Sequence, residues 1–111
     1  MEKKIISTTN APGAVGPYSQ AIKVGNLVFT SGQLPLDSVT GELIGDVKKA
    51  TEKSLENVKA ILEEAGTSLD KVIKTTVFVK NMSDFAAVNE VYAQYFQKDM
   101  RASSTSKRCL S

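Results

Sequence analysis

The sequence contains no histidine, no tryptophan and a single cysteine, Cys109. The absence of histidine excludes a Ser-His-Asp triad, a histidine general base and metal sites built on imidazole ligands, and we expect no metal. One cysteine cannot form a disulfide within the chain, which fits a reducing cytosol. Any chemistry must therefore use carboxylates, lysine, arginine, tyrosine, hydroxyl groups, amides or the backbone.

The chain also lacks a long hydrophobic run, since no segment approaches the ~20 apolar residues of a membrane-spanning helix. Residues 1–7 carry charges but no apolar core of the kind that defines a signal peptide. We therefore expect no membrane partner. With 111 residues, one domain is expected, and oligomerisation would strengthen its modest core.

The net charge of +2 comes from the C-terminal end of the chain. Residues 101–111 hold Arg101, Lys107 and Arg108 and no acidic residue, so residues 1–100 carry a net charge of −1. A basic end is weak support for a nucleic-acid surface, and we do not expect nucleic acid as a partner.

Two apolar, β-rich runs at residues 21–24 and 27–30 flank Gly25-Asn26. This spacing predicts a two-residue hairpin. A further strand is predicted at residues 71–80, with Ile73, Thr75, Val77 and Val79 on its more buried face.

Two helices are predicted, over residues 46–65 and about 83–96. Asp46 is the expected N-cap of the first helix, and Gly66 is the residue expected just past its end. For the second helix, Asn81 or Ser83 is the expected cap. Its expected buried stripe is Phe85, Val88, Tyr92 and Tyr95/Phe96.

Residues 99–111 lose this periodicity and are predicted to form an atypical, disordered tail after a domain that spans residues 1–98. The element order predicts an α+β fold in which two helices pack on one face of a sheet and the final strand is missing. A sheet with one bare face needs a cover, so a homo-oligomer is expected.

The best candidate site is the loop at residues 16–20 together with the end of the hairpin at residues 30–33. Tyr18 offers an aromatic ring with a hydroxyl group, and Ser31 and Gly32 offer hydroxyl and amide groups for an anion or carbonyl. An ordinary turn, with Tyr18 at the edge of the core, explains the same residues. Asn89 on the second helix is equally compatible with a helix-packing amide.

Several segments, in this order and at this spacing, resemble the RidA/YjgF family of reactive-intermediate deaminases. They cover roughly residues 4–96. The segments are Ala11-Pro12 through Gly16-Pro17-Tyr18-Ser19-Gln20-Ala21, Phe29-Thr30-Ser31-Gly32-Gln33-Leu34-Pro35, Thr40-Gly41-Glu42, Leu55-Glu56-Asn57-Val58-Lys59-Ala60-Ile61-Leu62, Lys74-Thr75-Thr76-Val77-Phe78-Val79 and Asp84-Phe85-Ala86-Ala87-Val88-Asn89-Glu90-Val91-Tyr92.

The resemblance implies a chorismate-mutase-like fold, assembled as a homotrimer with clefts between subunits. It also implies cytosolic hydrolysis, without a cofactor, of 2-aminoacrylate, 2-iminopropanoate and 2-iminobutanoate to 2-keto acids and ammonia. In this picture Tyr18 and Ser31 are catalytic, and Gly32 and Asn89 bind the substrate. Some relatives are instead described as ribonucleases, translation inhibitors or regulators, so a non-catalytic ligand-binding or RNA-associated protein is the alternative.

The family pattern after the second helix is Pro-Ala-Arg-Ser, followed by a final strand with an acidic residue. The matching run here is Arg101-Ala102-Ser103-Ser104, which places Ser103 where the family arginine would grip the substrate carboxylate. Arg101 is the nearest substitute, two residues early. We expect impaired activity and interpret the tail as a reading-frame change or premature end, which resequencing the coding DNA would test.

Overall fold

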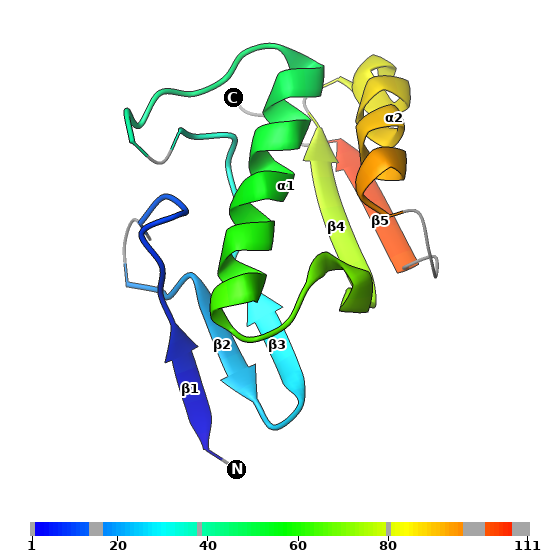
Figure 1. Cartoon of the computed structure of the whole chain (residues 1–111). Helices are drawn as coiled ribbons and strands as arrows, with labels where there is room; N and C mark the ends of the chain where they lie inside the picture. Colours follow the sequence, from blue (N-terminus) through cyan, green and yellow to red (C-terminus); the bar gives the residue numbers. More distant parts are fainter. Residues whose placement is uncertain (1, 14–16, 38, 80, 97–101, 108–111) are drawn as a thin grey trace. The chain divides into compact units, whose positions relative to one another are not determined.

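Figure 1 shows the computed structural model of the chain, which describes residues 2–13, 17–37, 39–79, 81–96 and 102–107. The chain divides into two compact units, Met1–Ser68 and Leu69–Ser111. The first unit holds β1 (Lys3–Ile6), β2 (Ala21–Val24), β3 (Leu27–Thr30) and α1 (Val47–Glu64). The second holds β4 (Lys74–Val79), α2 (Phe85–Tyr95) and β5 (Ala102–Lys107), with 3-10 turns at Leu69–Lys71 and Met82–Asp84. These elements confirm the predicted α+β class.

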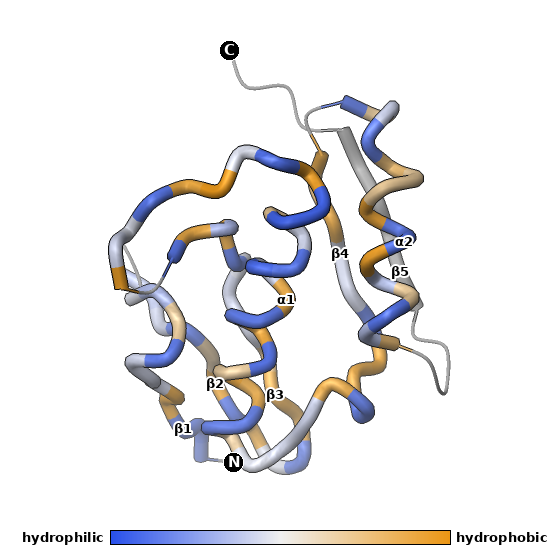
Figure 2. The backbone as a smooth tube through the Cα atoms, turned by 45° about the horizontal axis from the view of Figure 1, so that its top comes forward, coloured by the Kyte–Doolittle hydropathy of each residue, from blue (hydrophilic) through white to orange (hydrophobic). Residues whose placement is uncertain are grey.

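The three strands of the first unit form an antiparallel sheet in the order β1-β2-β3. The predicted hairpin is confirmed, because Val24 pairs with Leu27 across Gly25-Asn26. Gly25 has a φ of 57°, as the first turn residue of a type II′ hairpin requires. Figure 2 shows hydrophobic residues along both strands of this hairpin.

Both predicted ends of α1 are confirmed. The Lys49 N–H donates to Asp46 Oδ2 at 3.0 Å, so the Asp46 side chain caps the helix start. At the other end Gly66 has a φ of 85°, which an L side chain adopts only with strain. The Thr67 N–H donates to the Leu62 carbonyl and the Gly66 N–H to the Glu63 carbonyl, which is the Schellman pattern.

The core of the first unit lies between α1 and the inner face of the sheet. It consists of Ile6, Ala11, Ala21, Ile61 and Ala65, with Val28 and Ala60 against it. Because side chains alternate along a strand, this packing sends the neighbouring strand residues to the opposite face.

Ile61 is fully buried in this core, with 0% of its surface exposed. Ile61→Ala should lower the free energy of unfolding by ~2–5 kcal/mol, through lost burial and the cavity left behind. Chemical denaturation followed by circular dichroism measures this. Val39→Ala is the matched control, because Val39 is 91% exposed and should change stability by less than ~0.5 kcal/mol. An equal effect of both substitutions would contradict this core.

In the second unit, the predicted faces are confirmed within β4, but the prediction is wrong for Ile73, which lies before the strand begins at Lys74 and is 74% exposed. Val79 is buried and Thr75 and Val77 are half-buried, while Lys74 and Phe78 are exposed. The predicted stripe of α2 is partly wrong, because its buried residues are Val88 and Val91, with Phe96 just after, whereas Phe85 is exposed. Asn81 makes no side-chain cap bond, and Asp84 stands at the N-cap of α2, also without one.

Residues 102–107 form a strand, where the sequence predicted a structureless tail and no final strand. This β5 pairs in parallel with β4, from Lys74 opposite Ala102 to Val79 opposite Lys107 (Figure 1). That part of the expectation is wrong because a helix after a strand carries the chain back to lie beside it, and backbone bonds tolerate serine and threonine. The limit of the domain at residue 98 stays a prediction, and residues 99–101 and 108–111 lie outside the described residues.

Candidate functional site

The β2-β3 hairpin brings two predicted site segments together. Ala21 pairs with Thr30 at the end of the ladder, so the next residues outward, Gln20 and Ser31, are neighbours. The Ser31 N–H donates to the Gln20 carbonyl at 2.9 Å, and the Ser31 hydroxyl donates to the Ser19 carbonyl. Ser31 is therefore fixed beside the run that carries Tyr18.

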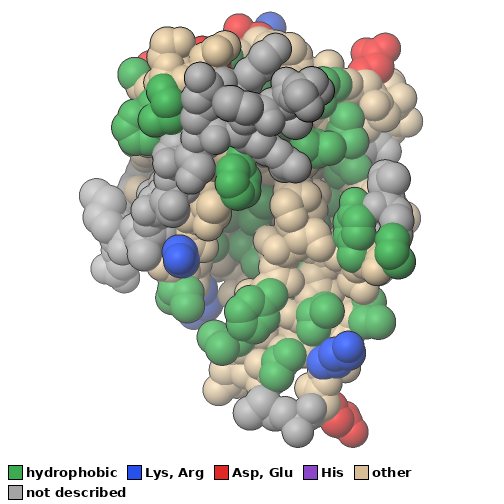
Figure 3. Space-filling view, turned by 180° about the vertical axis from the view of Figure 1, so that it is seen from behind, with side chains coloured by type: hydrophobic (Ala, Val, Ile, Leu, Met, Phe, Trp, Pro, Cys, Tyr) green, Lys and Arg blue, Asp and Glu red, His purple; other side chains and the backbone are tan. Residues whose placement is uncertain are grey.

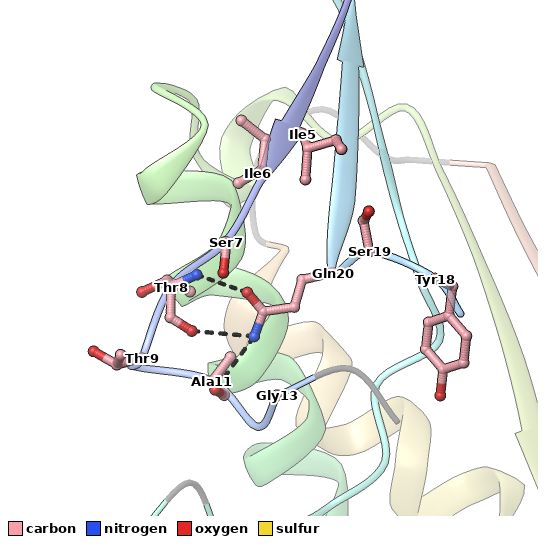
Figure 4. Close-up of a pocket in the computed structure, with 10 residues that line it drawn as sticks. All are labelled: Ile5, Ile6, Ser7, Thr8, Thr9, Ala11, Gly13, Tyr18, Ser19 and Gln20. Atoms are coloured by element: carbon pink, nitrogen blue, oxygen red, sulfur yellow. Dashed lines mark hydrogen bonds between the residues drawn. The ribbon is translucent and has the colours of Figure 1, made fainter. Parts of the chain in front are cut away.

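Tyr18 lines a cavity of about 530 Å³ in the first unit. Its other walls come from the end of β1, from residues between Thr8 and Gly13, and from Ser19 and Gln20 (Figure 4). The Tyr18 side chain is 56% exposed, so it is not a core residue. Apart from the Tyr18 phenol, no titratable side chain lines this cavity among the described residues.

The hydrogen bonds of Ser31 determine what its hydroxyl can offer. A carbonyl oxygen only accepts, so the bond to the Ser19 carbonyl uses the single proton of the Ser31 hydroxyl. What remains on Ser31 Oγ is acceptor capacity, directed at a ligand N–H or a water molecule. The hydroxyl is thus arranged as an acceptor and not as a free donor.

Gly32 supplies the complementary group. It is exposed, and nothing lies within 4 Å of the place where a Cβ would stand. Within the described part of the chain its N–H has no hydrogen-bond partner, so it is available to an acceptor such as a carboxylate oxygen. An acceptor on Ser31 and a donor on Gly32 therefore occupy adjacent positions.

Gln20 belongs to the predicted site loop at residues 16–20, but sequence reasoning gave its side chain no role. It is 5% exposed, and its side-chain amide points from β2 into the loop that begins at Thr8 (Figure 4). A polar residue just before a strand gives no sequence signal of burial, because the same type is usually found at the surface.

Of the predicted site residues only Tyr18 lines this cavity, because Ser31 and Gly32 are not among its lining residues, although Ser31 is bonded to Ser19 and Gln20, which are. Asn89 is an exposed residue of α2, in the second unit. Arg101 lies outside the described residues. No group of three or more histidine, cysteine, aspartate or glutamate residues that could hold a metal ion occurs among the residues that the structure describes.

The turn that follows the site segment is closed by Asp37. Its Oδ1 accepts the N–H of Val39 at 2.8 Å and of Thr40 at 3.0 Å. The hydrogen bond from the Thr40 N–H has the largest effect and the one from the Val39 N–H the next largest. Both favour the charged carboxylate and hold its pKa below the ordinary value of 3.8.

A lowered pKa means that the folded turn favours the charged carboxylate. The stabilisation is present above the ordinary pKa of 3.8 and is lost as the pH falls through the lower folded value. NMR titration of the Val39 and Thr40 amides should therefore give a common midpoint below 3.8. A midpoint at or above 3.8 would contradict these two bonds.

Comparison with known proteins places the chain among relatives. Residues 8–108 match the family model described as Endoribonuclease L-PSP. A RutC family protein of Pyrococcus horikoshii is 60% identical over 95 residues, which cover 85% of this chain and 75% of that protein. The 2-iminobutanoate/2-iminopropanoate deaminase of Escherichia coli K12 is 50% identical over 93 residues, 84% of this chain and 73% of that protein.

Among solved structures, Escherichia coli TdcF with bound serine superposes with a TM-score of 0.91 at 47% sequence identity. The match covers 95% of this chain and 85% of that one. Within the described residues, no helix has both the length and the apolar character needed to cross a bilayer.

Proposed function

Because the chain belongs to the Endoribonuclease L-PSP family, in which the RidA/YjgF deaminases fall, we propose that it hydrolyses 2-imino acids and their enamine tautomers to 2-keto acids and ammonia. The observation that carries the proposal is the adjacent acceptor and donor on Ser31 and Gly32, where Ser31 is bonded to Ser19, the residue that follows Tyr18. The 50% identity to the Escherichia coli deaminase supports the reaction class.

The arrangement suits a 2-imino acid, which carries an N–H donor and a carboxylate on neighbouring carbons. In the proposed complex, Ser31 Oγ accepts the imine N–H and the Gly32 N–H donates to a carboxylate oxygen. Serine, the ligand bound in the TdcF structure, has the same neighbouring amino and carboxylate groups. The ligand class of that relative thus supports the assignment.

Little chemical assistance is needed at neutral pH. Water adds to the imine carbon, the nitrogen takes up protons, the carbon–nitrogen bond breaks, and the oxygen of the water becomes the keto oxygen as ammonia leaves. The protein supplies orientation and polarisation, and the Tyr18 hydroxyl is the group proposed to hold the water. The resemblance implies that no cofactor takes part, and the expected place of action is the cytosol.

We also propose that the active form is a homotrimer. The outer face of the first sheet is apolar and uncovered: Ile5 and Phe29 are each 62% exposed and Leu27 is 51% exposed. Figure 3 shows hydrophobic side chains gathered over this sheet. A second copy of the chain is proposed to cover this face, because the resemblance implies clefts between subunits and Tyr18 lies shortly before β2 of the same sheet.

An assay coupled to a threonine or serine dehydratase tests the reaction. The dehydratase releases the enamine, and the protein should accelerate the appearance of the 2-keto acid. Ser31→Ala should remove most of that acceleration, because the N–H of the imine loses its acceptor. If the chain gives no acceleration while an intact relative does, the deaminase proposal fails.

The second candidate function is RNA binding or cleavage, which the family description Endoribonuclease L-PSP favours. The net charge of −1 over residues 1–100 speaks against strong phosphate binding. A filter-binding titration decides between the two, since a steep loss of RNA affinity with rising salt would favour the RNA function.

A further inference from the structure

We propose that Gln20 is a positioning residue, which holds the Thr8–Pro12 loop at the wall of the cavity and Ser31 beside the Tyr18–Ser19 run. Part of its test rests on the proposed function, because one readout is deaminase activity. The claim concerns a side chain that contacts no ligand in the proposed complex and acts through its neighbours.

The Gln20 amide makes four hydrogen bonds to a single loop. Its Oε1 accepts the Thr8 N–H at 2.6 Å. Its Nε2 donates to the carbonyls of Thr8 at 3.1 Å, Ala11 at 3.3 Å and Pro12 at 2.8 Å. Figure 4 shows this amide inside the curve of the loop.

The Gln20 side chain continues the hydrogen-bond ladder between β1 and β2 beyond the last backbone pair. The backbone pairing of the two strands ends at Ile6 opposite Ala21. One step further, the Gln20 amide bonds both the N–H and the carbonyl of Thr8, as a peptide group of a neighbouring strand would do. The loop thereby stays attached to β2 after the strands have separated.

The backbone of the same residue holds the catalytic segment. The Gln20 carbonyl accepts the Ser31 N–H, and the preceding carbonyl, of Ser19, accepts the Ser31 hydroxyl. Gln20, which directly follows the Tyr18–Ser19 run, thus joins that run to the Thr8–Pro12 loop and to Ser31. A shift of Gln20 would move both the cavity wall and the Ser31 acceptor.

Only an amide fits this position. A carboxylate of the same length keeps an acceptor for the Thr8 N–H but turns its second oxygen toward three carbonyls. Burial and these carbonyls raise the pKa of such a carboxyl. When protonated it donates one hydrogen bond and restores part of the network, and when charged it repels the loop.

Gln20→Glu is therefore the informative variant. Its kcat/KM relative to the wild type should fall about tenfold or more as the pH rises from ~6 to ~9, because the protonated fraction falls tenfold per pH unit above the pKa. The wild-type amide does not titrate. The titratable groups around the loop, present in both proteins, are Tyr18 on the cavity and Glu56, Lys59, Glu63 and Glu64 on the α1 side of Thr8.

Asn57→Asp is the matched control. Asn57 is also a buried amide, 1% exposed, and its Nδ2 donates to the carbonyls of Leu34 and Leu36. It lies on α1 and does not line the cavity. The control should lose stability in the same way while kcat/KM of the folded protein keeps the wild-type pH profile.

Amide hydrogen exchange gives a readout that needs no activity. In Gln20→Glu at high pH, exchange at Thr8 and Ser31 should accelerate at least tenfold relative to the wild type, while Ile61 in α1 keeps its protection. If the wild type proves inactive, the deaminase proposal fails and this exchange pattern alone decides the role of Gln20. Two results would overturn the inference. One is unchanged exchange at Ser31 in Gln20→Glu. The other is a kcat/KM of Gln20→Glu, relative to the wild type, that does not change with pH and equals that of Asn57→Asp.

Gln20→Met covers the case in which the charged variant does not fold. This neutral side chain of similar length makes none of the four hydrogen bonds, so its activity loss should match the high-pH loss of Gln20→Glu at every pH. If both variants are unfolded by circular dichroism, Gln20 serves the fold as a whole and the positioning role is rejected.

Discussion

Phe29→Asp should convert the proposed homotrimer to a monomer and lower kcat/KM for the proposed imine hydrolysis at least ~100-fold. Loss of the ring that the proposed contact would bury removes ~2–3 kcal/mol from each copy's contact, and each 1.4 kcal/mol is tenfold in association. A carboxylate enclosed in an apolar contact adds a desolvation penalty. The activity falls with the assembly because the proposed clefts lie between subunits.

The position of Phe29 in the sheet explains the expected size of this effect. Phe29 stands opposite Ile22 on β2, and Ile22 stands opposite Ile5 on β1. Ile6, Ala21 and Val28 face α1 in the core, so the row through Phe29 faces away from it. A charge at Phe29 therefore stands in the same row as Ile22 and Ile5, on the apolar face that the proposed contact covers.

Size-exclusion chromatography with light scattering measures the mass, and the dehydratase-coupled assay measures the rate. Val39→Asp is the matched control, because Val39 is 91% exposed and lies outside the strands. The control should remain assembled and active. A wild-type chain that is monomeric yet active would remove the homotrimer proposal and leave the reaction standing, whereas an assembled and active Phe29→Asp would place the interface elsewhere.

Local patterns predicted the parts of the fold that local chemistry determines. The Gly25-Asn26 hairpin, the Asp46 cap and the Gly66 end each depend on a few neighbouring residues, and the structure confirms all three. The pairing of Ser31 with the Ser19–Gln20 run follows from the hairpin register, once Ala21 is known to face Thr30.

Long-range pairing accounts for what the sequence did not show. β5 is held by backbone bonds to β4, and its serine-rich composition carries neither alternation nor apolar character. Gln20 acts through backbone atoms of residues eight to twelve positions away. Neither contact depends on the type of the partner side chain, so a pattern of residue types contains no trace of it.

The same strand gives the second large expected effect. Ser103, opposite Thr75 in the β4-β5 register, stands where the resemblance expects the arginine that grips the substrate carboxylate. Ser103→Arg should raise kcat/KM by about 10- to 100-fold, because a charge-assisted hydrogen bond contributes ~1.5–3 kcal/mol. The gain should appear mainly as a lower KM for 2-imino acids.

Two control variants distinguish a specific contact of the guanidinium introduced at position 103 with the substrate carboxylate from a general effect of added positive charge. Ser104→Arg adds the same side chain one position away from the one that the resemblance gives to the arginine, so little gain is expected. Ser103→Lys places a single point charge at the correct position and should recover only part of the gain, since an ammonium lacks the planar fork that matches a carboxylate. An imine without a carboxylate should gain nothing from any of these changes. Equal gains from Ser103→Arg and Ser104→Arg would instead indicate electrostatic attraction of the anionic substrate to the whole surface.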